Sequence, residues 1–195
     1  MNALRASYPL LTARLQIRPL GRADVEEFVA YRRDPDVARW QSWGSNYGRA
    51  DALALIDAQP TGDLPPPGQW LQLAVRSLDG TRLFGDLGVH RIVAPSSTFE
   101  IGVSIAGACQ GRGLATEALR RLITFLFHDA AAHRIVAYCD ARNSPVKALL
   151  ARVGLRQETS PLPPEWFKGE WSTLEVYALL AGERPAAVSG PGGRR

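Results

Sequence analysis

Apolar and polar residues alternate along residues 98–105, and this period of two predicts a half-buried β-strand. The apolar positions are Phe99, Ile101, Val103 and Ile105. After a glycine-bearing turn, apolar residues recur every three or four positions from Leu114 to His128, which predicts an amphipathic helix. A strand, a glycine-bearing turn and a long helix are therefore the predicted centre of the chain.

The same patterns predict further elements on both sides of this centre. Strands are expected over residues 11–20, 70–76, 82–93, 134–140 and 174–180, and helices over residues 24–33, 48–58 and 144–153. Asp24 is the expected cap of the first helix, and Asp79-Gly80 is the expected turn of a hairpin. Residues 60–68 and 160–169 are rich in proline and are expected to be loops. The central strand therefore follows an antiparallel meander.

Length and composition are typical of one globular domain. The chain has 195 residues, of which 46% are hydrophobic. We expect a single domain over residues 1–182 and a disordered tail over residues 183–195, which are rich in Gly, Pro and Arg. Apolar runs are shorter than the roughly 18 residues of a membrane span, and the N-terminus lacks the apolar core of a signal peptide. These features predict a cytoplasmic protein without a membrane partner.

Charge and cysteine usage exclude some classes of function. The net charge is +4, but lysine occurs only as Lys147 and Lys168, and the arginines are scattered along the chain. A nucleic-acid surface needs clustered basic residues, so we expect no nucleic-acid partner. Cys109 and Cys139 show neither CxxC nor metal-ligand spacing, and the histidines show no metal spacing either. Two reduced thiols and no bound metal are therefore expected.

The turn before the long helix has the composition of a phosphate-binding site. Gly111 and Gly113 let a ligand approach the main chain closely, and the first turn of a helix presents unpaired N–H groups with a partial positive charge. Arg112 adds a full charge. Residues 110–115 read Q-G-R-G-L-A, which resembles the acyl-CoA signature Q/R-x-x-G-x-G/A of the GNAT N-acetyltransferase superfamily.

The resemblance extends over roughly residues 11–180. Residues 12–19 resemble the T-x-R-L-x-L-R-P opening of the Rim-type branch, named for ribosomal-protein N-terminal acetyltransferases, and residues 34–37 match its D-P-x-V segment. Residues 143–155 resemble the motif N-x-x-[SA]-x-x-L-x-x-x-x-G-[FL]. The resemblance implies an α/β (α+β) fold, with a mixed, mostly antiparallel sheet of about seven strands flanked by helices and splayed at the CoA site.

Binding of acetyl-CoA is implied by the same motifs. In the family, backbone groups of the central strand pair with the pantetheine arm, and the amides of the following turn hold the pyrophosphate. The matching strand positions are Val103, Ser104 and Ile105, and those of the turn and first helical residues are Gln110, Gly111, Arg112, Gly113, Leu114, Ala115 and Thr116. Asn143 matches the asparagine that binds pantetheine, although an Asx turn before the helix is an equally simple role.

Candidates for acceptor binding and proton removal lie outside these motifs. Trp40, Trp43 and Tyr47 are candidates for substrate contact, and packing of a helical flap is their alternative role. Glu100 is the first choice for the general base, and a salt-bridged strand carboxylate is its alternative role. On the neighbouring strand, the spacing of Asp86 and His90 places both on one face, and both are further candidates for substrate contact.

The proton donor to the CoA thiolate is left open between two candidates. Many GNAT enzymes place a tyrosine seven residues after the motif asparagine, where this chain has Leu150. Tyr138 on the preceding strand, or solvent, can supply the proton instead. Cys109 lies next to the motif, but no activating histidine is near it in the sequence and GNAT enzymes transfer the acetyl group directly, which disfavours a cysteine nucleophile.

These observations predict an acetyl-CoA-dependent N-acetyltransferase that acts on a primary amine, either a protein N-terminus or a small molecule. A non-catalytic CoA-binding or regulatory module is the alternative that the missing tyrosine favours. A dinucleotide-binding oxidoreductase is disfavoured. Its glycine fingerprint follows the first strand of a βαβ unit, with an acidic residue about 20 positions on, whereas the turn in this chain follows several antiparallel strands and has no acidic residue at Ala132. The oligomeric state, monomer or homodimer, is left open.

Overall fold

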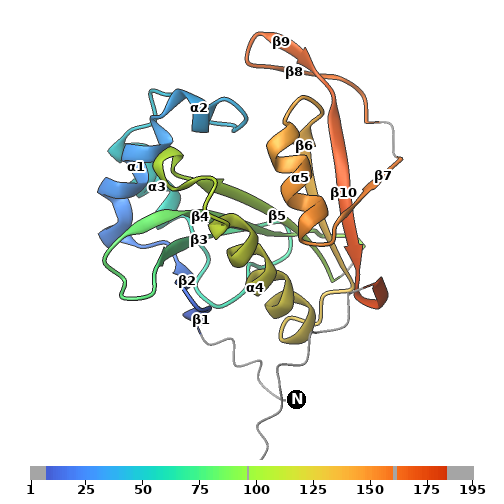
Figure 1. Cartoon of the computed structure of the whole chain (residues 1–195), viewed down its shortest axis with the longest axis horizontal. Helices are drawn as coiled ribbons and strands as arrows, with labels where there is room; N and C mark the ends of the chain where they lie inside the picture. Colours follow the sequence, from blue (N-terminus) through green and yellow to red (C-terminus); the bar gives the residue numbers. More distant parts are fainter. Residues whose placement is uncertain (1–7, 96, 160–161, 184–195) are drawn as a thin grey trace, which may run out of the picture.

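The computed structural model describes residues 8–95, 97–159 and 162–183. An eight-stranded sheet crosses the molecule in the order β1-β2-β3-β4-β5-β6-β10-β7 (Figure 1), and β8 and β9 form a separate hairpin. The strands are β1 (Leu10–Leu11), β2 (Leu15–Pro19), β3 (Trp70–Ser77), β4 (Leu83–Arg91), β5 (Thr98–Ile105), β6 (Arg134–Asp140), β7 (Arg156–Glu158), β8 (Glu165–Phe167), β9 (Glu170–Ser172) and β10 (Leu174–Leu180). Every pairing is antiparallel except that of β5 with β6, so the predicted mixed, mostly antiparallel sheet is confirmed.

Helices cover both faces of the sheet. They are η1 (Arg22–Asp24), α1 (Val25–Arg32), α2 (Pro35–Ala38), α3 (Arg49–Asp57), η2 (Gly107–Cys109), α4 (Leu114–His128), α5 (Ser144–Arg152) and η3 (Ala181–Glu183). The apolar stripe of α4, with Leu119 and Leu122 fully buried, packs on the face that carries Phe99 and Ile101. Phe28 of α1 packs on the other face, against Ala74. This confirms the predicted strand and long helix at the centre.

The sheet splays at its centre. Strand β6 pairs with β5 at three positions, Thr98, Phe99 and Glu100, and β6 then continues beside β10. Residues 101–105 of β5 therefore have no β6 neighbour, and their backbone groups face the gap between the two strands. The predicted splay is confirmed, and it places free strand backbone directly before the glycine-bearing turn.

Two predictions about the outer parts of the chain were wrong. The first strand does not run over residues 11–20: β1 folds back antiparallel on β2, with Leu10 opposite Ile17, and the side chain of Leu11 is 55% exposed. In the predicted loop 160–169, residues 165–167 form β8 of a hairpin with β9. Strand β7 was also not predicted, so the sheet has eight strands rather than about seven. The predicted tail lies, apart from Glu183, outside the described residues.

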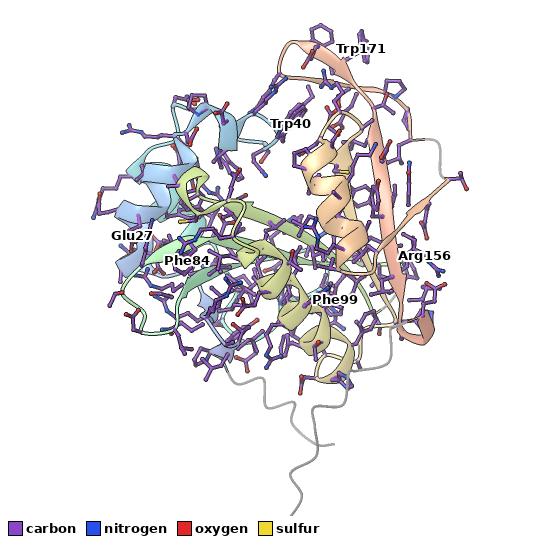
Figure 2. The ribbon with its side chains drawn as sticks, viewed as in Figure 1. Glu27, Trp40, Phe84, Phe99, Arg156 and Trp171 are labelled. Carbon is purple, nitrogen blue, oxygen red and sulfur yellow. The ribbon has the colours of Figure 1, made fainter. Side chains whose placement is uncertain are left out.

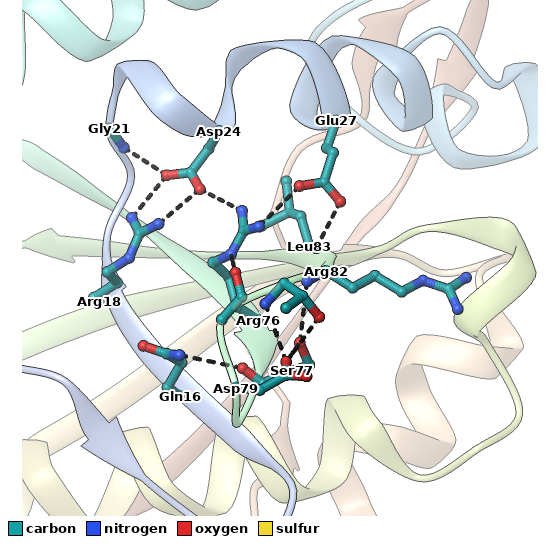
Figure 3. A network of polar contacts seen from close by, with 12 residues as sticks. Gln16, Arg18, Gly21, Asp24, Glu27, Arg76, Ser77, Asp79, Arg82 and Leu83 are labelled. Atoms are coloured by element: carbon teal, nitrogen blue, oxygen red, sulfur yellow. Dashed lines mark hydrogen bonds and ion pairs between the residues drawn. The ribbon is translucent and has the colours of Figure 1, made fainter.

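Asp24 does not cap α1 as predicted; it anchors a buried polar network (Figure 3). Its carboxylate, fully buried, accepts two hydrogen bonds from Arg18 (both 2.8 Å), one from Arg76 (2.6 Å) and one from the Gly21 N–H (2.8 Å). Arg76 also pairs with Glu27 (2.9 Å). The network fastens β2, α1 and β3 together, and so fixes α1 over the sheet.

Candidate functional site

The turn between β5 and α4 has the backbone geometry of an anion cradle. Gly111 (φ 72°) and Gly113 (φ 76°) adopt left-handed conformations that favour glycine, and a Cβ at Gly111 would meet nothing within 4 Å. The first hydrogen bond at the start of α4 is donated by the Glu117 N–H to the Gly113 carbonyl (3.1 Å). The N–H groups before it have no intrahelical acceptor, and together with the helix dipole they attract an anion.

This cradle forms one end of a cavity of about 940 Å³, the helix-side cleft, which lies between the end of β5, α4 and α5. Every cofactor-binding residue predicted from the sequence lines it except Arg112, whose carbonyl accepts a hydrogen bond from Arg14 (3.0 Å). Asn143 lines the cleft and caps α5 by accepting from the Val146 N–H (3.4 Å), so the cap is formed and pantetheine binding by Asn143 stays a prediction. Leu150 is buried in the core.

Basic residues that the motifs did not identify also line the helix-side cleft. Arg14 pairs with Glu117 (2.6 Å), while Arg120 donates to the Arg152 carbonyl (3.1 Å), and all four residues border the cleft. Arg14 lies in the predicted opening motif, but its contact with Glu117 joins residues 103 positions apart. A local sequence pattern cannot predict such a contact, so the motif did not place Arg14 at the cleft. These guanidinium groups add positive charge around the cradle.

A second cavity of about 590 Å³, the flap-side cavity, lies on the opposite face of the sheet. It is lined by residues of β3, β4 and β5, by residues at α1 and α3, and by the flap segment, defined as residues 38–43, from the last residue of α2 to the residue before Gly44. The two cavities share three lining residues, Gln41, Val103 and Ser104. They therefore meet at the splayed half of β5, where the helix-side cleft reaches the other face of the sheet.

One buried carboxylate lies in the flap-side cavity next to this junction. Asp86 is directly opposite Ser104 across the β4–β5 pair and is 2% exposed. It accepts hydrogen bonds from the Tyr31 hydroxyl, the Gln72 amide and the Arg32 guanidinium (3.3 Å). Burial raises the pKa of the Asp86 carboxyl well above its ordinary value. Hydrogen bonds donated to a carboxylate favour its ionised form, so the three donors act against the effect of burial.

Arg32 is held in place by aromatic rings. Its guanidinium lies 3.6 Å from the centroid of Trp43 and 4.0 Å from that of Phe28, and the Trp43 indole N–H donates to the Arg32 carbonyl (3.2 Å). Burial lowers the pKa of Arg32 to about 10, which leaves the side chain cationic at neutral pH. Burial disfavours both charges of the Arg32–Asp86 pair, and the attraction between the two groups offsets part of that cost.

His90 and Glu100 lie on the same sheet face as Asp86, as predicted, but farther along it. They are directly opposite each other on β4 and β5, and His90 Nδ1 lies 3.2 Å from a Glu100 carboxylate oxygen. The Trp70 indole stacks on the imidazole at 4.9 Å with 13° between the planes. Trp70 lines the flap-side cavity, whereas His90 and Glu100 are not among its lining residues. The structure thus brings Asp86, and not Glu100, to the cavity.

The remaining predicted residues separate into three groups. Trp43 lines the flap-side cavity and Trp40 lines the helix-side cleft; Figure 2 shows Trp40 between the α2 and α5 sides of the molecule. Tyr47 is buried against Phe28 (ring centroids 5.9 Å apart), in agreement with its alternative packing role. Tyr138 on β6 is 41% exposed and lines neither cavity.

Comparisons with known proteins agree with this geometry. Residues 14–156 match the family described as Acetyltransferase (GNAT) domain. The chain is 26% identical to the "Uncharacterized N-acetyltransferase p20" of Bacillus licheniformis over 174 residues, 89% of this chain and 97% of that protein. It is 30% identical to the "Putative ribosomal N-acetyltransferase YdaF" of Bacillus subtilis over 105 residues, 54% of this chain and 57% of the relative. The fold superimposes on spermidine N-acetyltransferase from Vibrio cholerae in complex with CoA and spermine, with a TM-score of 0.75 and 17% identity over 88% of this chain and 98% of the other.

Within the described residues, no helix is long and apolar enough to cross a membrane. The two cysteines, Cys109 and Cys139, are free and buried, as expected.

Proposed function

Since the chain belongs to the GNAT family and is an N-acetyltransferase, we propose that it transfers the acetyl group of acetyl-CoA directly to a primary amine in the flap-side cavity. One observation carries this proposal: the helix-side cleft and the flap-side cavity meet at Gln41, Val103 and Ser104. A donor in one cavity and an acceptor in the other therefore come together on β5 without a covalent enzyme intermediate.

The helix-side cleft fits CoA in shape and in chemistry. The open space at Gly111 and the unpaired N–H groups at the start of α4 suit a pyrophosphate. The charged lining residues are Arg14, Arg120 and Arg152 with Asp36 and Glu117; Arg14 is paired with Glu117, and the arginines leave a positive excess. The edge of residues 103–104 that has no β6 partner is available to pair with the pantetheine amides, with Asn143 beside it, whereas the Ile105 carbonyl accepts a hydrogen bond from Gln110 (2.9 Å). When bound, acetyl-CoA supplies an activated thioester carbonyl, and the chain orients it toward Ser104.

We assign proton removal from the amine to Asp86 rather than to Glu100. An attacking amine must lose a proton, and a base is most effective when its pKa approaches the working pH. Asp86 borders the cavity opposite Ser104 and has a raised pKa, while Glu100 is engaged with His90 outside the cavity lining. The CoA thiolate takes its proton from solvent, because no tyrosine is among the described residues that line the helix-side cleft.

The charge of the flap-side cavity favours an acceptor whose body is uncharged. Among the described lining residues, the charged side chains are Arg32 and Asp86, which offset each other. Trp43 and Trp70 supply aromatic surface, and Gln69 supplies an amide. A polyamine would bring additional positive charges to this cavity without carboxylates to balance them. A peptide N-terminus or a small amine with a neutral body meets these conditions.

The test is release of CoA from acetyl-CoA across a panel of primary amines, in wild type and in a variant with a filled acceptor cavity. Gly102 lines the flap-side cavity, and a Cβ there would meet nothing within 4 Å, so Gly102→Leu extends into open space. We expect this variant to lose transfer while it retains CoA binding. Gly182→Leu is the matched control, because a Cβ at Gly182 also meets nothing and Gly182 lies in η3, outside both cavities.

Unchanged turnover in Gly102→Leu would contradict the location of the acceptor. Binding of CoA by the wild type without turnover of any amine would favour a CoA-binding module instead of an enzyme acting on amines.

A further inference from the structure

The β8–β9 hairpin has an unusual residue in its turn. Phe167 pairs with Glu170, which leaves a two-residue turn of Lys168 (φ 50°) and Gly169 (φ 88°). Two positive φ angles in such a turn favour Asn-Gly, Asp-Gly or Gly-Gly, since other side chains are crowded in this conformation. A lysine at the first position is unfavourable for the turn itself, so contacts of its side chain must compensate for it.

The Lys168 side chain reaches the far side of the site. Its ammonium donates to the Ala38 carbonyl and to the Trp43 carbonyl, both at 2.6 Å, across 130 and 125 positions of sequence. Both carbonyls belong to the flap segment, which begins at the end of α2. In Figure 1 the hairpin extends above the gap between the α2 side and the α5 side of the molecule. Lys168 thus joins the C-terminal hairpin to the N-terminal helical flap.

The hairpin is itself attached to the opposite side. Glu170 pairs with Arg142 (2.8 Å), and the Ser172 hydroxyl donates to Asp140 at the end of β6 (2.7 Å). A cross-strand tryptophan pair, Trp166 and Trp171, packs edge to face with ring centroids 5.5 Å apart. The hairpin is therefore a fixed arm on the β6 side, and its contacts with the flap segment connect the two sides of the cleft.

The flap segment forms part of both cavities. Trp40 lines the helix-side cleft, Gln41 lines both cavities, and Trp43 lines the flap-side cavity. The Trp43 ring also packs on Arg32, the partner of Asp86. A shift of this segment would therefore change the wall of the acceptor cavity and the environment of the proposed base, while the phosphate cradle on α4 would stay in place.

We propose that Lys168 is a positioning residue that holds the flap segment against the acceptor cavity. The inference rests on the proposed function of that cavity. Two charge-assisted hydrogen bonds to backbone carbonyls fix the segment irrespective of its side chains. The acceptor then enters a cavity whose tryptophan wall is already in place, which lowers the ordering cost of binding.

The experiment compares Lys168→Asn, Lys168→Met and Lys168→Arg with wild type in steady-state acetyl transfer. Lys168→Asn is the decisive variant. Asparagine favours this turn, so the variant removes the ammonium while the hairpin is retained. We expect the KM for the amine to rise about tenfold in Lys168→Asn and Lys168→Met, with the KM for acetyl-CoA within about twofold of wild type. Lys168→Arg, which retains charged donors, should recover most of the affinity.

Two further measurements separate positioning from general stability. Amide hydrogen exchange at residues 38–43 should be faster in Lys168→Asn at an unchanged thermal midpoint. Lys147→Met is the matched control, because the Lys147 ammonium also makes two hydrogen bonds, to the Ala141 carbonyl (3.1 Å) and to the Glu175 carboxylate (3.0 Å), but Lys147 lines neither cavity. It should leave the amine KM unchanged.

An unchanged amine KM together with unchanged exchange in Lys168→Asn would overturn the inference. Its failure is distinguishable from failure of the proposed function. If wild type transfers acetyl to no amine, the proposed function fails, and hydrogen exchange alone still decides whether Lys168 holds the flap segment.

Discussion

Replacing Asp86 with asparagine should abolish most acetyl transfer. The change keeps the shape of the side chain and its acceptor oxygen for Tyr31 or Gln72, but it removes the base. Loss of a positioned general base reduces the rate by about 10²- to 10⁴-fold, which corresponds to about 3–5 kcal/mol of transition-state stabilisation. We expect this loss in kcat/KM for the amine, measured as CoA release, while affinity for CoA is unchanged.

The structure also predicts a cost in stability. In Asp86→Asn the buried Arg32 guanidinium loses the carboxylate 3.3 Å away, and removing one partner of a buried ion pair costs about 3–5 kcal/mol. Thermal unfolding must therefore be recorded beside the kinetics, and rates compared at a temperature where both proteins are folded. The pH profile of wild type gives an independent measurement: because the base must be deprotonated, kcat/KM should fall as the pH falls through a pKa well above that of an ordinary aspartate.

Glu100→Gln is the matched comparison on the same sheet face. The Glu100 side chain is 24% exposed and pairs with His90. The substitution should therefore lower the free energy of unfolding by less than about 1 kcal/mol and change kcat/KM less than fivefold. A loss of 100-fold or more in Glu100→Gln, with an active Asp86→Asn, would refute the assignment and return the role of base to Glu100.

Three other changes test separate parts of the structure. Asp24→Asn breaks a network around a fully buried carboxylate and should lower the free energy of unfolding by about 3–5 kcal/mol, which corresponds to about 6–20 °C in the thermal midpoint. The control is Asp57→Asn, in an exposed pair with Arg22, which should shift the thermal midpoint by less than about 4 °C. Burial alone would raise the pKa of Asp24, but its hydrogen bonds with Arg18 and Gly21 bring that pKa below the ordinary value. The contribution of the Asp24 carboxylate to the free energy of unfolding should therefore be complete at neutral pH and lost as the pH falls through the lowered pKa. Gly113→Asp should weaken CoA binding at least tenfold in calorimetry, because it places a carboxylate at the N-terminus of α4. A Cβ there meets Arg14 at an ordinary 3.6 Å, but the left-handed φ of 76° should lower the free energy of unfolding by about 1–2 kcal/mol, which thermal unfolding measures beside the binding. Gln69→Glu should raise turnover of spermidine about fivefold, and no increase would contradict charge-based selection of the acceptor.

Local patterns were sufficient for the centre of the fold. Strand β5 and helix α4 follow from periods of two and 3.6 residues within one stretch, and Gly111 and Gly113 mark the turn because their positive φ angles favour glycine. The predicted cofactor-binding residues that line the helix-side cleft belong to continuous motifs, whereas Arg120 in the same lining does not.

Contacts between distant segments explain what the sequence did not predict. The break between β1 and β2 is stabilised by Glu117, which accepts hydrogen bonds from the Thr12 hydroxyl (2.6 Å) and the Arg14 N–H (3.0 Å) more than 100 positions away. The choice between Asp86 and Glu100 depended on strand register and on which side chains border the cavity, neither of which is a local property. The proline content of residues 160–169 predicts a loop, and it contains no sign of the Lys168 contacts, because the partners Ala38 and Trp43 lie at least 125 positions away.

Transfer at the junction of the two cavities is tested most directly by a crystal structure with acetyl-CoA bound. We predict that the pyrophosphate lies on the N–H groups of residues 111–116 and that the acetyl carbonyl lies beside Val103 and Ser104, open to the flap-side cavity. An acetyl group bound away from β5, or separated from the flap-side cavity by the sheet, would contradict direct transfer to an amine in that cavity.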